Sequence, residues 1–117
     1  MRIVKLFEDF NTLQFIINQV KGILRPLTSF YYTNKVEIEE GSLFITISKN
    51  TPDRIKVFHT SDILPTLKEV NEYLTLGESF RLDEVFVQTI NGEIELSDIE
   101  SLKTVSGIVV ITLIFKM

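Results

Sequence analysis

The sequence ends in a run of mainly apolar residues, VSGIVVITLIFKM, from Val105 to Met117. The stretch between Ile108 and Phe115 is far shorter than the roughly 20 residues of a membrane-spanning helix. Because β-branched residues favour an extended conformation, this stretch is expected to form a strand. Successive side chains of a strand point to opposite faces of the sheet, and here both faces carry large aliphatic residues. We therefore expect this strand to be central in its sheet and covered on both faces.

Alternation along the strand separates two sets of side chains. One face, expected to lie under helices, carries Val105, Val109, Ile111, Leu113 and Phe115. The opposite face carries Ile108, Val110 and Ile114. Burial of each contributes about 1.5–3 kcal/mol, against about 5–15 kcal/mol for a whole domain, so a fully exposed second face is unfavourable. We expect this face to contact another subunit or protein. An internal cover, from the segment after Ser97 or from residues 30–32, is the alternative.

The rest of the chain predicts helices and hairpins. The short opening, residues 2–7, is rich in β-branched residues and is expected to be a strand. A helical pattern follows, which begins at an Asn11 cap and ends at Arg25-Pro26. Phe10 and Phe15 are expected to form a hydrophobic staple at its start. Period-two patterns predict strands over residues 35–39, 43–48 and 54–59. A second helix is expected from Ser61 or Asp62 to a left-handed stop at Gly77. Asn91-Gly92 signals a hairpin between strands 80–90 and 93–96, and a capping box from Ser97 to Glu100 opens a short helix.

This order of elements predicts a single α+β domain over residues 1–117. Adjacent strands joined by short turns make a mostly antiparallel sheet. Two main helices would cover one face as a two-layer sandwich, with the short third helix beside them. The N-terminus turns acidic by Glu8 and resembles no signal peptide, so we expect a soluble, cytoplasmic protein without a membrane segment.

Charge is unevenly distributed along the chain. The formal net charge is −4, and acidic residues dominate between Glu69 and Glu100. Nucleic-acid binding requires clustered lysine or arginine, which is absent here, so we expect no nucleic-acid partner. The acidic stretch suits either a solvated surface or a basic protein partner. Glu93 and Glu95 are the residues expected to face such a partner.

Catalytic and metal-binding signals are weak. The chain has no cysteine and only one histidine, His59, which precedes Ser61 and Asp62 at an expected helix start. No nucleophile elbow accompanies them, so we interpret the pair as capping residues. Glu93, Glu95, Asp98 and Glu100 form the main carboxylate cluster, and each has a strand or helix-start role that needs no metal. We expect no cofactor and no metal, and the sequence favours a protein that is not an enzyme.

These observations favour a non-catalytic module for protein interaction or assembly, self-associating or docking a larger protein. Its expected contact residues are Ile108, Val110, Ile114, Glu93 and Glu95, and a homo-oligomer is the expected form. Viral, phage or other mobile-element proteins with structural or inhibitory roles share this size and composition. The alternative is a small-ligand-binding or hydrolytic domain with a pocket between helices and sheet, which would require convergent polar groups.

Overall fold

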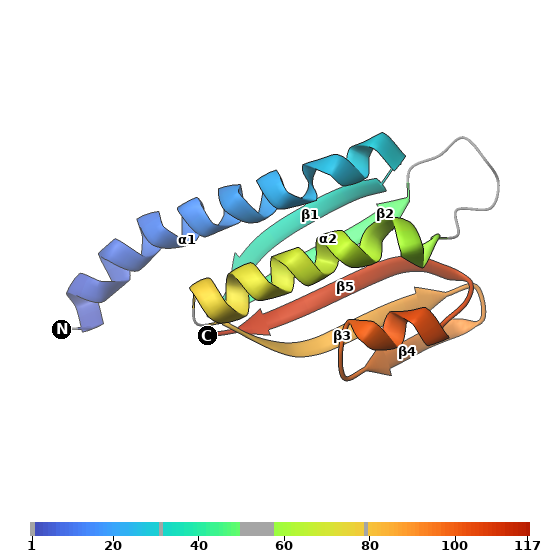
Figure 1. Ribbon diagram of the computed structural model, residues 1–117. Helices are drawn as coiled ribbons and strands as arrows, with labels where there is room; N and C mark the ends of the chain where they lie inside the picture. Colours follow the sequence, from blue (N-terminus) through green and yellow to red (C-terminus); the bar gives the residue numbers. More distant parts are fainter. Residues whose placement is uncertain (1, 31, 50–57, 79) are drawn as a thin grey trace.

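The computed structural model describes residues 2–30, 32–49, 58–78 and 80–117, with side chains from residue 13 onward. A five-stranded antiparallel sheet and two helices give it an α+β fold (Figure 1). The helices are α1 (Arg2–Leu24) and α2 (Thr60–Glu72). The strands are β1 (Tyr32–Glu39), β2 (Ser42–Lys49), β3 (Arg81–Thr89), β4 (Gly92–Leu96) and β5 (Ile108–Lys116). Shorter helical turns are η1 (Arg25–Phe30), η2 (Tyr73–Gly77) and η3 (Glu100–Thr104).

The strand order across the sheet is β1-β2-β5-β3-β4. All four neighbouring pairs are antiparallel, as the short connections predicted. The C-terminal strand β5 is therefore central, with two strands on each side, which confirms the expected position of the terminal apolar run in the sheet.

Two tight turns close the hairpins. Glu40 and Gly41 both have positive φ, 51° and 80°, the geometry of a primed turn whose twist matches its strands. In the second hairpin Thr89 pairs with Gly92, and only Gly92 has positive φ, at 133°. There the Thr89 hydroxyl accepts the Asn91 N–H (3.1 Å) and donates to the Gly92 carbonyl (2.8 Å). The predicted hairpin is confirmed, but its turn is stabilised by a threonine side chain rather than by two left-handed residues.

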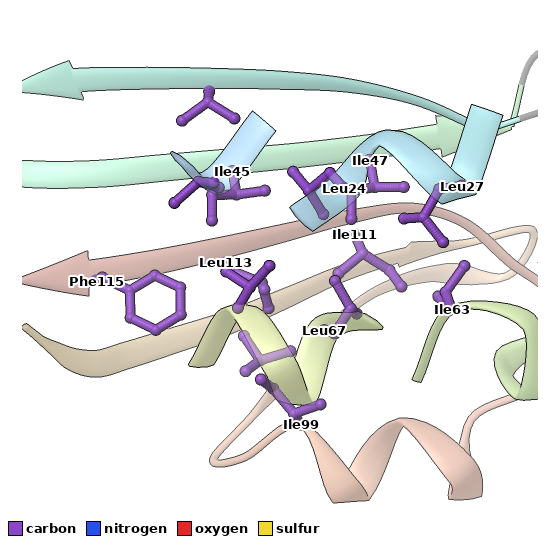
Figure 2. Close-up of a cluster of buried hydrophobic side chains, with 14 of the residues drawn as sticks. Leu24, Leu27, Ile45, Ile47, Ile63, Leu67, Ile99, Ile111, Leu113 and Phe115 are labelled. Carbon is purple, nitrogen blue, oxygen red and sulfur yellow. The ribbon is translucent and has the colours of Figure 1, made fainter. Parts of the chain in front are cut away.

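The main core lies between the helices and one face of the sheet (Figure 2). β5 contributes Ile111, Leu113 and Phe115, each with 0% of its surface exposed. Helical residues pack against them, among them Leu24 from α1 and Leu67 from α2, both also fully buried. α1 and α2 lie beside one another on this side of the sheet.

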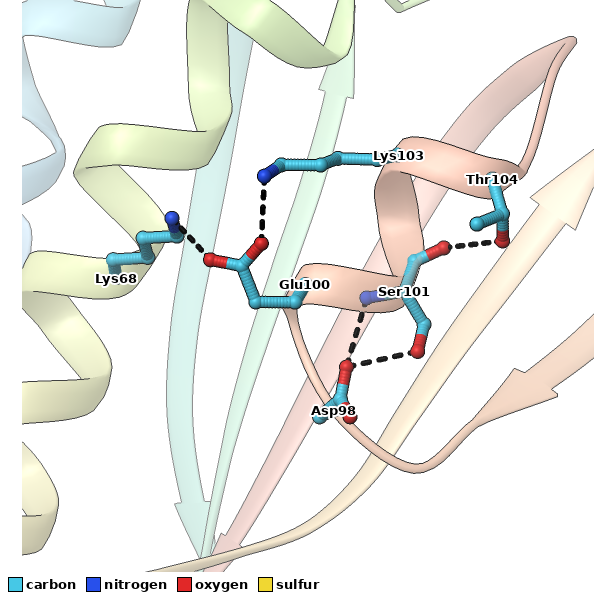
Figure 3. A network of polar contacts seen from close by, with 6 residues as sticks. All are labelled: Lys68, Asp98, Glu100, Ser101, Lys103 and Thr104. Atoms are coloured by element: carbon cyan, nitrogen blue, oxygen red, sulfur yellow. Dashed lines mark hydrogen bonds and ion pairs between the residues drawn. The ribbon is translucent and has the colours of Figure 1, made fainter.

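η3 joins the same core beside α2. Its Leu102 is fully buried, and Ile99 just before it is 4% exposed. Glu100 forms ion pairs with Lys68 of α2 and with Lys103 (2.8 Å to the latter), as Figure 3 shows. The segment after Ser97 thus belongs to the helix side of the sheet and does not cover the second face.

The N-terminal part of the chain differs from the expectation. Residues 2–7 belong to α1 and do not form a strand, and Asn11 lies inside the helix rather than capping it. Because the helix does not begin at Asn11, Phe10 and Phe15 do not flank an N-cap as the expected staple requires, and Phe15 is 55% exposed. Extending an existing helix adds one hydrogen bond per residue without a new nucleation cost, which outweighs the β-branched preference of a six-residue segment. The strand expected over residues 54–59 falls largely outside the described residues.

The end of α2 also differs. Gly77 does not have positive φ. Instead α2 widens into the π-helical turn η2, and the Phe80 N–H then donates to the Leu74 carbonyl (2.9 Å). Tyr73 donates its hydroxyl proton to Glu78 (2.9 Å), and burial together with this bond raises the pKa of Tyr73 to about 12.

Candidate functional site: the open face of the sheet

The face of the sheet opposite the helices is here called the open face. Along β1, β2, β3 and β5 its residues lie between the buried ones, and they are half-buried or exposed. No helical segment of the described chain packs on this face, since the buried side chains of α1, α2 and η3 belong to the core on the other side. Its centre is apolar, formed by Phe44 of β2, Phe86 of β3, and Val110 and Ile114 of β5.

Strand pairing fixes which residues of the open face are neighbours. The central row runs across all five strands and consists of Lys35, Thr46, Thr112, Phe86 and Glu95. On one side of it lies the row Glu37, Phe44, Ile114 and Glu84. On the other side lies the row Thr33, Ser48, Val110, Gln88 and Glu93. The four apolar residues of these rows therefore all lie on the three middle strands, where threonines, Ser48, Gln88 and Glu84 stand between them, and both outer strands carry charged residues.

Ile108 is not on the open face, contrary to the expectation from strict alternation. Its side chain is 1% exposed and belongs to the core. Ile108 pairs with Thr89 while Val110 pairs with Gln88, so Val109 is an extra residue in β5, as in a β-bulge. Because of this extra residue, a side chain that precedes the bulge in β5 points to the face opposite the one that strict alternation predicts. The open face keeps Val110 and Ile114 of the three predicted aliphatic residues.

Phe86 was missed as a surface residue by the sequence analysis. Val85 and Val87 on either side of it are fully buried, so alternation alone places Phe86 on the opposite face. Together with Phe44, it extends the apolar centre from β5 onto both neighbouring strands.

Glu93 and Glu95 lie on β4 at the margin of the open face, and both are exposed. Neither carboxylate forms an ion pair within the described part of the chain, and neither does Glu84. Two other charges of this face are paired: Lys35 with Glu37 (2.8 Å), which raises the lysine pKa, and Lys116 with Asp83 (3.3 Å). The β4 margin therefore carries uncompensated negative charge.

A hollow of about 680 Å³ lies at one corner of the open face, where the β1–β2 turn meets the end of β5. Its lining consists of Glu39, Glu40, Gly41, Ser42, Phe44, Lys116 and Met117. This hollow is on the far side of the sheet from the helices, whereas the ligand-binding alternative placed a pocket between helices and sheet.

The residues around His59 form no catalytic arrangement. The His59 backbone N–H donates to the Tyr32 hydroxyl (3.0 Å), and its carbonyl accepts the Asp62 N–H (2.9 Å). Among the described residues, no hydrogen bond links the His59 ring to Ser61 or Asp62. Tyr32 itself is in the core, edge-to-face with Phe58 at 4.8 Å between ring centres, and desolvation raises its pKa. Tyr32 thus does not cover the open face.

The acidic residues around η3 have structural partners. Asp98 accepts hydrogen bonds from the Ser101 N–H and hydroxyl, both at 2.8 Å (Figure 3). Asp98, rather than the predicted Ser97, therefore caps this turn. Glu100 pairs with two lysines, and these contacts lower its pKa. Within the residues that the structure describes, no group of three acidic or histidine side chains is placed to hold a metal ion.

Comparison of the chain with family models, with curated proteins and with solved structures finds no match. None of the described helices is both long enough and apolar enough to cross a membrane.

Proposed function

We propose that this protein is a non-catalytic module for protein interaction or assembly, which uses the open face of its sheet to bind a protein surface. The observation that supports this is the apolar centre of Phe44, Phe86, Val110 and Ile114, with no described helix over it. In this proposal α1 and α2 form one layer and the sheet the second, and the binding partner supplies the missing third layer. Margins of charged side chains around an apolar centre are the usual anatomy of protein interfaces.

The open face is large enough for such a contact. Strands lie about 4.8 Å apart and rise about 3.4 Å per residue, so five strands of about eight residues present on the order of 600 Å². Specific interfaces bury roughly 800 Å² per partner, and about 500 Å² per partner is the lower limit. The open face therefore supports a moderate-affinity contact, with apolar residues at its centre as the main source of affinity.

The test is the double variant Val110→Asp/Ile114→Asp, which places charge on the open face. It should fold, because both positions are only half-buried, whereas Ile111→Asp should unfold the domain, because Ile111 is fully buried. Leu76→Asp is the matched control, since Leu76 is 84% exposed and lies in η2, away from the sheet.

Circular dichroism establishes folding, and light scattering gives the mass in solution. The same variants, carrying an affinity tag, are then compared for the proteins that co-purify with them. The proposal expects the double variant to lose either its own oligomer or a partner that the wild type and Leu76→Asp both retain. A folded double variant with unchanged mass and unchanged partners would refute it.

A further inference from the structure

The two ends of the central row carry opposite charges. Lys35 lies on β1 and Glu95 on β4, and each is two strands away from Thr112 on β5. Both side chains belong to the open face and are exposed. The two residues are therefore placed symmetrically about the middle strand.

Two copies placed face to face are related by a two-fold axis lying between their sheets. When that axis runs parallel to β5, β5 lies over β5, and β1 of one copy faces β4 of the other. Lys35, which also pairs with Glu37 of its own strand (2.8 Å), then stands opposite Glu95 of the second copy, and the same contact forms twice. Facing sheets pack about 10 Å apart, a distance that a lysine and a glutamate can span together. We propose, building on the function proposed above, that the open face binds a second copy of this chain in this orientation.

The same orientation brings together the aliphatic residues of the two β5 strands. Val110 and Ile114 of β5 lie on the axis and meet the same residues of the second copy, whereas Phe86 faces Thr46 and Phe44 faces Glu84. Lys116 also approaches Lys116 of the second copy near the axis, but the ion pair of each lysine with Asp83 offsets the repulsion between the two positive charges. Strands of facing sheets that run within about 30° of each other are a common packing arrangement.

The other face-to-face orientation is less favourable. A two-fold axis running across the strands would stack β4 on β4. That strand, Gly92–Leu96, carries Glu93 and Glu95 and no basic residue, so four carboxylates would come together. Like charges facing each other are destabilising, whereas the orientation along β5 brings each Glu95 to a lysine.

The test is a charge swap, measured as a dissociation constant by sedimentation over a dilution series at low salt. Lys35→Glu alone and Glu95→Lys alone each turn two attractive contacts into repulsive ones, so each should weaken the dimer roughly tenfold or more. The double variant Lys35→Glu/Glu95→Lys restores opposite charges at both contacts and should regain affinity to within about threefold of the wild type. Lys21→Glu/Glu69→Lys, on the exposed sides of α1 and α2, is the matched control and should have no effect.

Failure of this inference is distinguishable from failure of the proposed function. A double variant as weak as either single variant overturns the orientation. In that case, loss of the dimer in Val110→Asp/Ile114→Asp still supports binding through the open face. A wild-type chain that stays monomeric at every concentration overturns the second-copy proposal. The proposed function is then decided by whether a different protein is retained by the wild type and lost by that double variant.

Discussion

Gly107, immediately before β5, determines how this strand enters the sheet. Its φ is 72°, a left-handed conformation that most residues avoid. Its carbonyl accepts the Ile90 N–H (2.9 Å), which joins the start of β5 to the turn after β3. The bulge at Val109 follows directly, so the glycine precedes the point at which Ile108 turns into the core and Val110 onto the open face.

Replacing Gly107 by alanine is expected to destabilise the protein by about 1–2 kcal/mol, the cost of a left-handed conformation for a residue with a Cβ. The new Cβ would also lie 3.0 Å from Cγ1 of Ile90, a side chain that is 67% exposed and can move. Urea denaturation of Gly107→Ala and of Gly107→Ala/Ile90→Ala separates the two effects. If the double variant recovered full stability, steric contact rather than backbone strain would be the cause.

At the scale of elements, η3 is held against α2 by two kinds of contact. Leu102 and Ile99 supply buried apolar surface, and Glu100 forms its ion pairs with Lys68 and Lys103 at the solvent side (Figure 3). Exposed ion pairs contribute little to stability, so the buried residues carry most of the attachment.

This division predicts different effects of two substitutions. Leu102→Ala should reduce the free energy of unfolding by about 2–5 kcal/mol, because it leaves a cavity in the core. Glu100→Gln should have a small effect that depends on pH. The folded-state pKa of Glu100 lies below its ordinary value of 4.5, so the ion-pair contribution is present above that value and is lost as pH falls through the folded-state pKa. Denaturation of the wild type and of Glu100→Gln should show a difference in the free energy of unfolding at neutral pH that disappears in acid.

The antiparallel sheet, the two hairpins and the central position of β5 were predictable because each has a local signal. Leu43, Ile45 and Ile47 alternate with polar or half-buried residues, and Glu40-Gly41 permits the turn. The bulge in β5 was not predictable, since one extra residue in a uniformly apolar strand leaves no trace in the alternation. Its effect is that Ile108, one of the three expected aliphatic contact residues, is in the core, whereas Val110 and Ile114 lie on the open face as expected.

The start of α1 shows a second limit of local patterns. Residues 2–7 have strand-like composition, but they continue a helix that extends to Leu24. The π-helical end of α2 and the Asp98 cap of η3 similarly depend on contacts between segments or on small changes of register. The roles of Glu93 and Glu95 as contact residues stay predictions, and the structure adds that they share one face with Phe86.

At the scale of the whole molecule, the sheet has helices on one side and a half-buried apolar centre on the other. A protein that buries this centre by self-association gains stability from mass action. We expect the thermal unfolding midpoint of the wild type to rise with protein concentration, and that of Val110→Asp/Ile114→Asp to stay constant. Differential scanning calorimetry over a hundredfold dilution tests this. A wild-type midpoint independent of concentration would contradict self-association.

The central position of β5 also has a consequence for how the chain folds. β1 pairs with β2 and β3 pairs with β4 through short turns, but the two hairpins share no strand pairing until β5 lies between them. β5 follows all the other strands in the sequence, so during synthesis both hairpins leave the ribosome before the strand that unites them. Sheet closure is then a late, long-range step whose rate is limited by loop entropy. Until that step, the edges of β2 and β3 that will later pair with β5 are unpaired. Unpaired strand edges are sites at which chains aggregate.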